Sequence, residues 1–185
     1  MPSNIEIKAR VKSPERLQEL AERLSDTQPE TVTQQDTFFP CANGRLKLRQ
    51  FSAHAGELIS YSRADVVGTK LSEYAIVRTF APTDLLAVLS LALGVQRTVT
   101  KTRVLWRAGQ TRIHLDSVVG LGFFVELEVV LRDDQTPEEG HRIARELMSA
   151  LEIEESDLVE GSYVDLLPLE RNACEEQPQA DKGTI

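Results

Sequence analysis

Four segments of this 185-residue chain alternate apolar residues with charged ones. Successive side chains of a β-strand point to opposite faces, so each segment predicts a strand with one apolar and one charged face. The first reads Asn4-Ile5-Glu6-Ile7-Lys8, the second Arg45-Leu46-Lys47-Leu48-Arg49, and the others span 111–116 and 125–129. A sheet of such strands must turn one kind of face inward, and that choice limits the folds available to the chain.

Further patterns predict an α+β arrangement of about eight, mostly antiparallel strands with three main helices. Helices are expected from Pro14, over about 83–93, and from Pro137 to about 151, with Ser13, Gly94 and Thr136 as end signals. Strands are expected over 4–11, 32–39, 45–51, 57–63, 73–80, 96–107, 110–117 and 123–132. A short helix near 156–160 and an extended segment over 161–167 complete the pattern. Eight strands can close into a barrel that holds side chains or one small ligand.

Composition narrows the class of protein. With 41% hydrophobic and 27% charged residues, we expect one globular domain over 1–168 and a disordered, apolar-poor tail over 169–185. The formal net charge of −8 argues against bulk attraction to nucleic acid or an anionic membrane. We see no signal peptide and no apolar run long enough to span a bilayer. Two distant cysteines, Cys41 and Cys174, indicate free thiols and a cytoplasmic location.

The charged positions of the strands separate by sign. The basic ones are Lys8, Arg10, Arg45, Lys47, Arg49, Arg63, Arg78, Lys101, Arg103 and Arg112, and the acidic ones are Glu6, Asp116, Glu126 and Glu128. For a single strand, a charged face usually lies on solvent. A strand with only bases and another with paired acids instead favour a shared, enclosed interior. Enclosed ions are costly unless they are paired, so these groups need counter-charges.

The natural counter-charges are a polyanion for the bases and a divalent cation for the acids. Glu6, Glu126 and Glu128 offer oxygen ligands with no Cys or His nearby in sequence, which suits Mg²⁺ or Mn²⁺ rather than zinc. Lys and Arg on rigid strands suit phosphate groups. The residues therefore indicate a site for a metal and a polyphosphate, and the alternative is a barrel with solvated charged faces and no anionic ligand.

These segments resemble the motifs of the CYTH superfamily, the triphosphate tunnel metalloenzymes. Its founding members are the class IV (CyaB-type) adenylyl cyclases and thiamine triphosphatase. The family's first strand carries Glu-x-Glu-x-Lys; here Glu6 and Lys8 match, and Asn4 stands in place of the first Glu. The basic strand 45–49 and the acidic pair in 126–128 match two further motifs. Segments 36–39 and 162–167 look most like the CyaB-type branch.

The resemblance implies a closed eight-stranded antiparallel β-barrel, with helices packed outside, whose tunnel holds a triphosphate. Phosphate binding is implied for Lys8, Arg45, Lys47, Arg49, Arg63, Lys101 and Arg103. Mg²⁺ or Mn²⁺ is implied at Glu6, Glu126 and Glu128, and catalytic roles for Glu6, Lys8, Asp116, Glu126 and Glu128. Asn4 removes one negative charge from the metal end, although its amide oxygen could still be a ligand.

Three functions are consistent with this resemblance. A cyclase would convert ATP to cyclic AMP and pyrophosphate, and a triphosphatase would hydrolyse inorganic, thiamine or nucleoside triphosphate. The CyaB-like segments favour the cyclase slightly, and Asn4 keeps open a third function, a non-catalytic binder of polyphosphate or nucleotide. The expected partner is a small-molecule triphosphate, without nucleic acid or membrane, and a homodimer is an open alternative. His114 is interpreted as paired with a carboxylate rather than as a general base, and Tyr163 as either a substrate contact or a packing residue.

Overall fold

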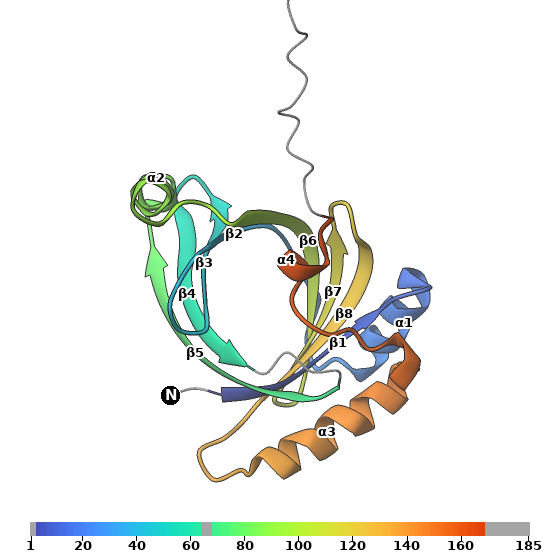
Figure 1. Ribbon diagram of the computed structural model, residues 1–185. Helices are drawn as coiled ribbons and strands as arrows, with labels where there is room; N and C mark the ends of the chain where they lie inside the picture. The colour runs from blue at the N-terminus through green and yellow to red at the C-terminus, as the bar shows by residue number, and fades with distance from the viewer. Residues whose placement is uncertain (1–2, 64–67, 169–185) are drawn as a thin grey trace, which may run out of the picture.

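The strands of the computed structural model, which describes residues 3–63 and 68–168, form one closed antiparallel barrel (Figure 1). The strands are β1 (Ser3–Arg10), β2 (Glu30–Phe39), β3 (Arg45–Ser52), β4 (Ala55–Arg63), β5 (Lys70–Thr79), β6 (Arg97–Ala108), β7 (Thr111–Val118) and β8 (Gly122–Val130). Their order around the barrel is β1-β5-β4-β3-β2-β6-β7-β8, and β8 pairs with β1 to close it. The predicted fold class is confirmed. The predicted tail over 169–185 lies outside the described residues.

All three main helices are present; the first and third begin where the sequence signals place them, and the second begins at Pro82, after Ala81 and without a side-chain cap. They are α1 (Pro14–Leu24), α2 (Pro82–Leu93) and α3 (Pro137–Ala150). The Ser13 side chain accepts a hydrogen bond from the Arg16 backbone, and Thr136 and Glu139 form a reciprocal capping box. Among the described helices, none has the length and apolar character needed to cross a membrane.

Two short elements near the C-terminus differ from the sequence prediction. The helix expected at 156–160 is a single 3-10 turn, Glu155–Asp157, and the segment expected to be extended contains the helix α4 (Tyr163–Leu166). Gly161 has a positive φ of 78°, which turns the chain. The Asp165 carboxylate then accepts a hydrogen bond from the Ser162 backbone N–H at 2.8 Å. This local side-chain to backbone bond stabilises a helical turn over an extended strand.

The apolar strand faces point outward, and helices cover them. α1 and α3 lie on one side of the barrel and α2 on the other (Figure 1). The main core lies under α1 and α3 and includes Ile5, Ile7, Trp106, Ile113, Leu127, Val129, Leu17, Ala144 and Met148. At Gly140 the backbone of α3 comes so close to β1 that a Cβ would lie 2.6 Å from Cγ1 of Ile5. The charged faces are therefore left to point into the barrel, as the division of signs predicted.

Helix α4 lies inside the ring of strands, near β6 (Figure 1). Its residues Tyr163 and Val164 join a second apolar cluster with Phe38, Val99, Val118 and Phe124. The guanidinium of Arg97 donates to the backbone carbonyl of Leu167 at 2.6 Å. These contacts fix α4 at one end of the barrel, where it becomes part of the cavity wall.

Candidate active site

The inward strand faces surround a cavity of about 660 Å³. Its charged lining residues among those described are Lys8, Lys47, Arg49, Arg63, Arg78, Lys101, Arg103 and Arg112 with Glu6, Asp36, Glu57, Glu126 and Glu128. The lining therefore has three more basic than acidic side chains, in a chain whose formal net charge is −8. A small polyanion is attracted to this cavity even though the whole molecule is acidic.

One pair of cations is held by Asp36, which lies on β2 opposite Arg49 of β3. The carboxylate accepts from Lys47 Nζ at 2.8 Å and from Arg49 Nε and Nη2 at 2.8 and 3.0 Å. Burial alone would raise the pKa of Asp36, but Arg49 and Lys47 lower it well below its usual value. Asp36 thus stays ionised and fixes two bases on the cavity wall.

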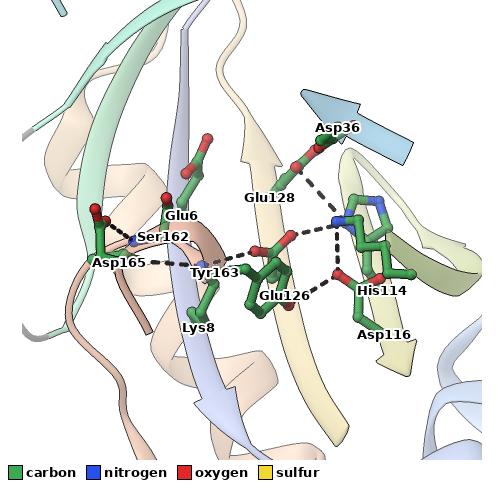
Figure 2. A network of polar contacts seen from close by, with 12 residues as sticks. Glu6, Lys8, Asp36, His114, Asp116, Glu126, Glu128, Ser162, Tyr163 and Asp165 are labelled. Carbon is green, nitrogen blue, oxygen red and sulfur yellow. Dashed lines mark hydrogen bonds and ion pairs between the residues drawn. The ribbon is translucent and has the colours of Figure 1, made fainter. Parts of the chain in front are cut away.

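A second pair of cations is held by Asp116 of β7, which is fully buried. Its carboxylate accepts from Lys101 Nζ at 2.9 Å and from Arg103 Nε and Nη2, both at 2.6 Å. The Tyr163 hydroxyl donates to the same carboxylate at 2.9 Å, as Figure 2 shows. Asp116 therefore lies behind the cations rather than on the cavity surface, and α4 is tied to this cluster.

Two lysines in the cavity have pKa values below the usual value for lysine. Lys8 lies 3.2 Å from Glu126, and its ammonium is 4.0 Å from the centre of the Tyr163 ring. Burial lowers the pKa of Lys8 to about 8, although Glu126 opposes the shift. Burial, followed by the charge of Arg49, lowers the pKa of Lys47 to about 8 as well. Both ammonium groups become easier to keep charged when an anion enters the cavity.

The acidic residue of the first strand lies near the carboxylates of β8 but is paired with a base. Glu6 is in register with Glu128, and its carboxylate accepts from Arg63 Nη1 at 2.6 Å. Burial and the negative charge of Glu128 raise the pKa of Glu6. Asn4, one inward position earlier on β1, is buried in the cavity lining. Its Oδ1 has no hydrogen-bond partner among the described residues.

Glu126 and Glu128 of β8 face the imidazole of His114 on β7 (Figure 2). His114 Nδ1 lies 4.0 Å from Glu126 and 3.7 Å from Glu128. Arg103 also contacts Glu126, and Arg112 lies 2.8 Å from Glu128. Burial, followed by the charge of Arg103, lowers the pKa of His114 to about 3, so the imidazole is neutral. One ligand atom from each of these three residues lies within 4.8 Å of the others, a grouping that could hold a metal ion.

Most of the site residues predicted from the sequence meet in this cavity. Lys8, Lys47, Arg49, Arg63, Lys101, Arg103, Glu6, Glu126 and Glu128 all line it. Arg45 instead lies at the α4 end, where its guanidinium donates to Asp165 at 3.0 Å. Arg10, included in the predicted charged face, is exposed and lies over the ring of Phe124. Both fall outside the cavity lining because their strands end at that edge of the barrel.

Three side chains, those of Asp36, His114 and Tyr163, make more contacts in the site than the sequence indicated. Asp36 is an inward carboxylate between two bases, a position that strict alternation along β2 would have revealed. His114 faces two carboxylates at once. Tyr163 packs edge-on against Phe124 at 5.0 Å, which confirms its packing role, and it also lines the cavity, where a substrate contact stays a prediction.

The family assignment follows from comparison with known sequences. The model of the CYTH domain matches residues 3–163. The chain belongs to the CYTH family. The match takes in all eight strands, α4's first residue and both carboxylate-bound cation pairs. No curated protein matches the chain.

Several solved structures share the barrel of this CYTH protein. A Pyrococcus horikoshii protein has a TM-score of 0.77 and 22% identity, covering 89% of this chain and 99% of its own. A proposed adenylate cyclase from Vibrio parahaemolyticus has a TM-score of 0.70 and 17% identity, covering 88% and 96%. A proposed adenylyl cyclase from Hippeastrum, described as having a dominant triphosphatase activity, has a TM-score of 0.59 and 20% identity, covering 81% and 88%. At these identities the likeness establishes the fold.

Proposed function

We propose that this CYTH protein is a divalent-metal-dependent enzyme that acts on a triphosphate in its barrel, and that its reaction converts ATP to cyclic AMP and pyrophosphate. The observation that carries the proposal is the enclosed cavity, in which a surplus of fixed cations surrounds a pair of neighbouring carboxylates. A polyphosphate supplies the negative charge that the cations need, and a divalent cation supplies the positive charge that the carboxylates need.

The cations are oriented in advance for phosphate. Arg49 and Arg103 each use Nε and Nη2 on a buried carboxylate, Asp36 or Asp116, so the Nη1 group of each is available to a ligand. Because their side chains are already fixed, less conformational entropy is lost when a phosphate binds. Asp116 therefore acts as a positioning residue in this proposal, rather than as a group that touches the substrate.

The acidic side chains suit a hard divalent metal. Glu126 and Glu128 are the central ligands in this proposal, and Glu6 lies in register with Glu128 on the next strand. The buried Asn4 Oδ1, which lacks a hydrogen-bond partner among the described residues, keeps an oxygen at the position where the family has its first Glu. When bound, Mg²⁺ or Mn²⁺ would neutralise phosphate charge and stabilise the departing pyrophosphate.

In the cyclase reaction the ribose 3′-hydroxyl gives its proton to water, its oxygen attacks the α-phosphorus, and the bond from that phosphorus to the bridging oxygen of the β-phosphate breaks. Pyrophosphate leaves with the electron pair, and the fixed lysines and arginines stabilise its growing charge. Phe51 and Leu105 line the cavity one inward position beyond Arg49 and Arg103, away from α4, and Val32 lines it in register with Arg103. An apolar lining at that level fits the base and sugar of a nucleotide, which favours ATP over inorganic triphosphate.

The second candidate function is triphosphate hydrolysis in the same cavity. Water replaces the ribose hydroxyl as nucleophile, and the terminal phosphorus replaces the α-phosphorus as its target. The Hippeastrum structure supports this candidate, since that protein, with the same fold, is described as having dominant triphosphatase activity. Asn4 supports the third candidate, a binder without turnover, because it lowers the negative charge at the proposed metal end.

Product analysis separates the three candidates. The protein is incubated with ATP, inorganic triphosphate or thiamine triphosphate, each with Mg²⁺ and with Mn²⁺, and cyclic AMP, pyrophosphate and phosphate are resolved. Cyclic AMP with equimolar pyrophosphate from ATP supports the cyclase. Phosphate without cyclic AMP, released with ADP from ATP or with equimolar pyrophosphate from inorganic triphosphate, supports the triphosphatase. Absence of turnover together with metal-dependent thermal stabilisation by triphosphate supports the binder.

Matched variants connect any activity to the cavity. We expect Glu128→Gln, which keeps the shape of the side chain and removes its charge, to abolish metal-dependent turnover. Glu22→Gln makes the same change on the exposed surface of α1 and should leave turnover unchanged. If no polyphosphate stabilises the wild-type chain with either metal, the proposal of a triphosphate site is wrong.

A further inference from the structure

The imidazole of His114 has no use in the charge pairing of the cavity. The side chain is 3% exposed, and Nδ1 has no hydrogen-bond partner among the described residues. Figure 2 shows the ring pointing toward the two carboxylates of β8. A buried ring nitrogen without a partner is costly in a folded protein, and usually indicates that a ligand or ion completes it.

The distances around His114 are too long for hydrogen bonds but suit a shared cation. Nδ1 lies 3.7 Å from Oε1 of Glu128 and 4.0 Å from Oε2 of Glu126. Ligand atoms around a metal with bonds of about 2.1 Å are separated by about 3 Å when adjacent and about 4.2 Å when opposite. The three residues therefore need only small side-chain movements to bind one ion.

The two carboxylates differ in how far the nearby bases occupy them. Arg103 Nη2 contacts Oε2 of Glu126, the oxygen that faces His114, so an ion bound there would displace this contact. Arg112 contacts Oε2 of Glu128, so Oε1 of the same carboxylate is the atom that faces His114. Glu6, which the sequence suggested as a metal ligand, is instead bound by Arg63 at 2.6 Å. The imidazole of His114 thus faces the paired carboxylates. Its place in the sequence, far from any other His or Cys, did not indicate this arrangement.

We propose that His114 supplies a nitrogen ligand to the metal ion bound by Glu126 and Glu128. The inference rests on the proposed metal site and specifies its ligands. A site with one imidazole and two carboxylates binds Mn²⁺ and later transition metals in preference to Mg²⁺, because Mg²⁺ binds oxygen ligands almost exclusively. The ligand set therefore determines which ion activates the protein.

Nitrogen coordination can be detected directly in the unmodified chain. The protein is produced with ¹⁵N-labelled histidine, loaded with Mn²⁺ alone, and studied by pulsed electron paramagnetic resonance for a coupling between the metal and ¹⁵N. The chain contains three histidines, so His114→Gln and the exposed loop variant His54→Gln are compared. We expect the ¹⁵N coupling in the wild type and in His54→Gln, and its loss in His114→Gln.

Metal titrations provide a second readout that does not depend on turnover. We expect His114→Gln to weaken Mn²⁺ binding about tenfold and Mg²⁺ binding about twofold or less. Triphosphate binding without metal verifies that the variant is folded. Mn²⁺ that binds the wild type without a ¹⁵N coupling, or a coupling that persists in His114→Gln, overturns the assignment of His114 and leaves the proposed triphosphate site intact. Failure of Mn²⁺ to bind even with triphosphate present overturns both the assignment of His114 and the proposed metal site.

Discussion

The sharpest test of the charged interior is the isosteric change Asp116→Asn. It removes the negative charge that binds both Lys101 and Arg103 while keeping the size of the side chain, and it leaves Glu126 as a second contact of Arg103. Asp116 is fully buried, so water cannot replace the lost charge. The two cations are left beside each other without their main counter-ion, and the fold should be strongly destabilised.

The size of the effect follows from this burial. Removing one partner of a buried ion pair costs about 3–5 kcal/mol. In a chain of this length, 1 kcal/mol shifts Tm by about 2–4 °C, so the variant should melt about 6–20 °C below the wild type. Burial alone would raise the pKa of Asp116, but Arg103 and Lys101 hold it below its usual value. The wild type therefore loses this stabilisation as pH falls below about 4, and the two proteins become more similar in acid.

Urea unfolding followed by circular dichroism measures the free energy of unfolding at pH 7 and pH 3. Asp133→Asn, an exposed change of the same kind, serves as the control and should stay within about 0.5 kcal/mol of the wild type. Inorganic triphosphate should restore part of the lost stability, because it supplies negative charge to the cations that have lost the Asp116 carboxylate. A loss below about 1 kcal/mol at pH 7, or a loss that grows in acid, would refute this account of the interior.

Three further results are expected. Gly140→Ala should lower the free energy of unfolding by about 1–3 kcal/mol without changing triphosphate affinity, because a Cβ there clashes with side chains of the core; denaturant titration and calorimetry measure the two quantities. Tyr163→Phe removes a hydrogen bond to the Asp116 carboxylate and should cost about 1.5–3 kcal/mol in the same unfolding assay. Triphosphate binding, measured by calorimetry, should weaken between pH 7 and pH 9, because Lys8 and Lys47 lose protons near pH 8. The ligand-free chain, measured by denaturation, should gain stability between about pH 8 and pH 10.5, because these lysines bind more protons in the unfolded chain than in the folded one. Absence of these opposite trends would contradict the role of the two lysines.

Much of the fold and of the site could be predicted from alternation alone. The strict two-residue period of segments such as Asn4–Lys8 places all charges on one face, and division of those charges by sign indicates an enclosed interior. The inward charged face and most of the lining residues follow from these patterns and are confirmed. The closed barrel, which the resemblance to the CYTH family implied, is confirmed as well. The metal and phosphate roles of these residues stay predictions.

The rest depends on contacts between distant parts of the chain. Alternation along β2 places Asp36 on the inward face, but its two cationic partners are set only when β3 pairs with β2 and brings Arg49 opposite it. Tyr163 reaches Asp116 only because α4 folds back into the ring, 47 positions away in sequence. Helix α4 itself is a single turn fixed by Asp165, too short to leave a periodic apolar pattern. Sequence patterns indicate the period of an element and which of its faces is apolar or charged. They do not indicate which elements pack against one another.

The uneven covering of the barrel has a mechanical consequence. Apolar contacts with α1 and α3 support β1, β6, β7 and β8. Among the described helices, α2 packs on the opposite side, against β2, β3 and β4, and the outward Leu71 and Val77 of β5 are 41% and 65% exposed. Because the barrel's interior is charged, its strands draw their cohesion from the outside. Amide hydrogens of β4 and β5 should therefore exchange with solvent faster than those of β7 and β8. The half of the barrel with the lighter covering is thus the half expected to have the lower local stability.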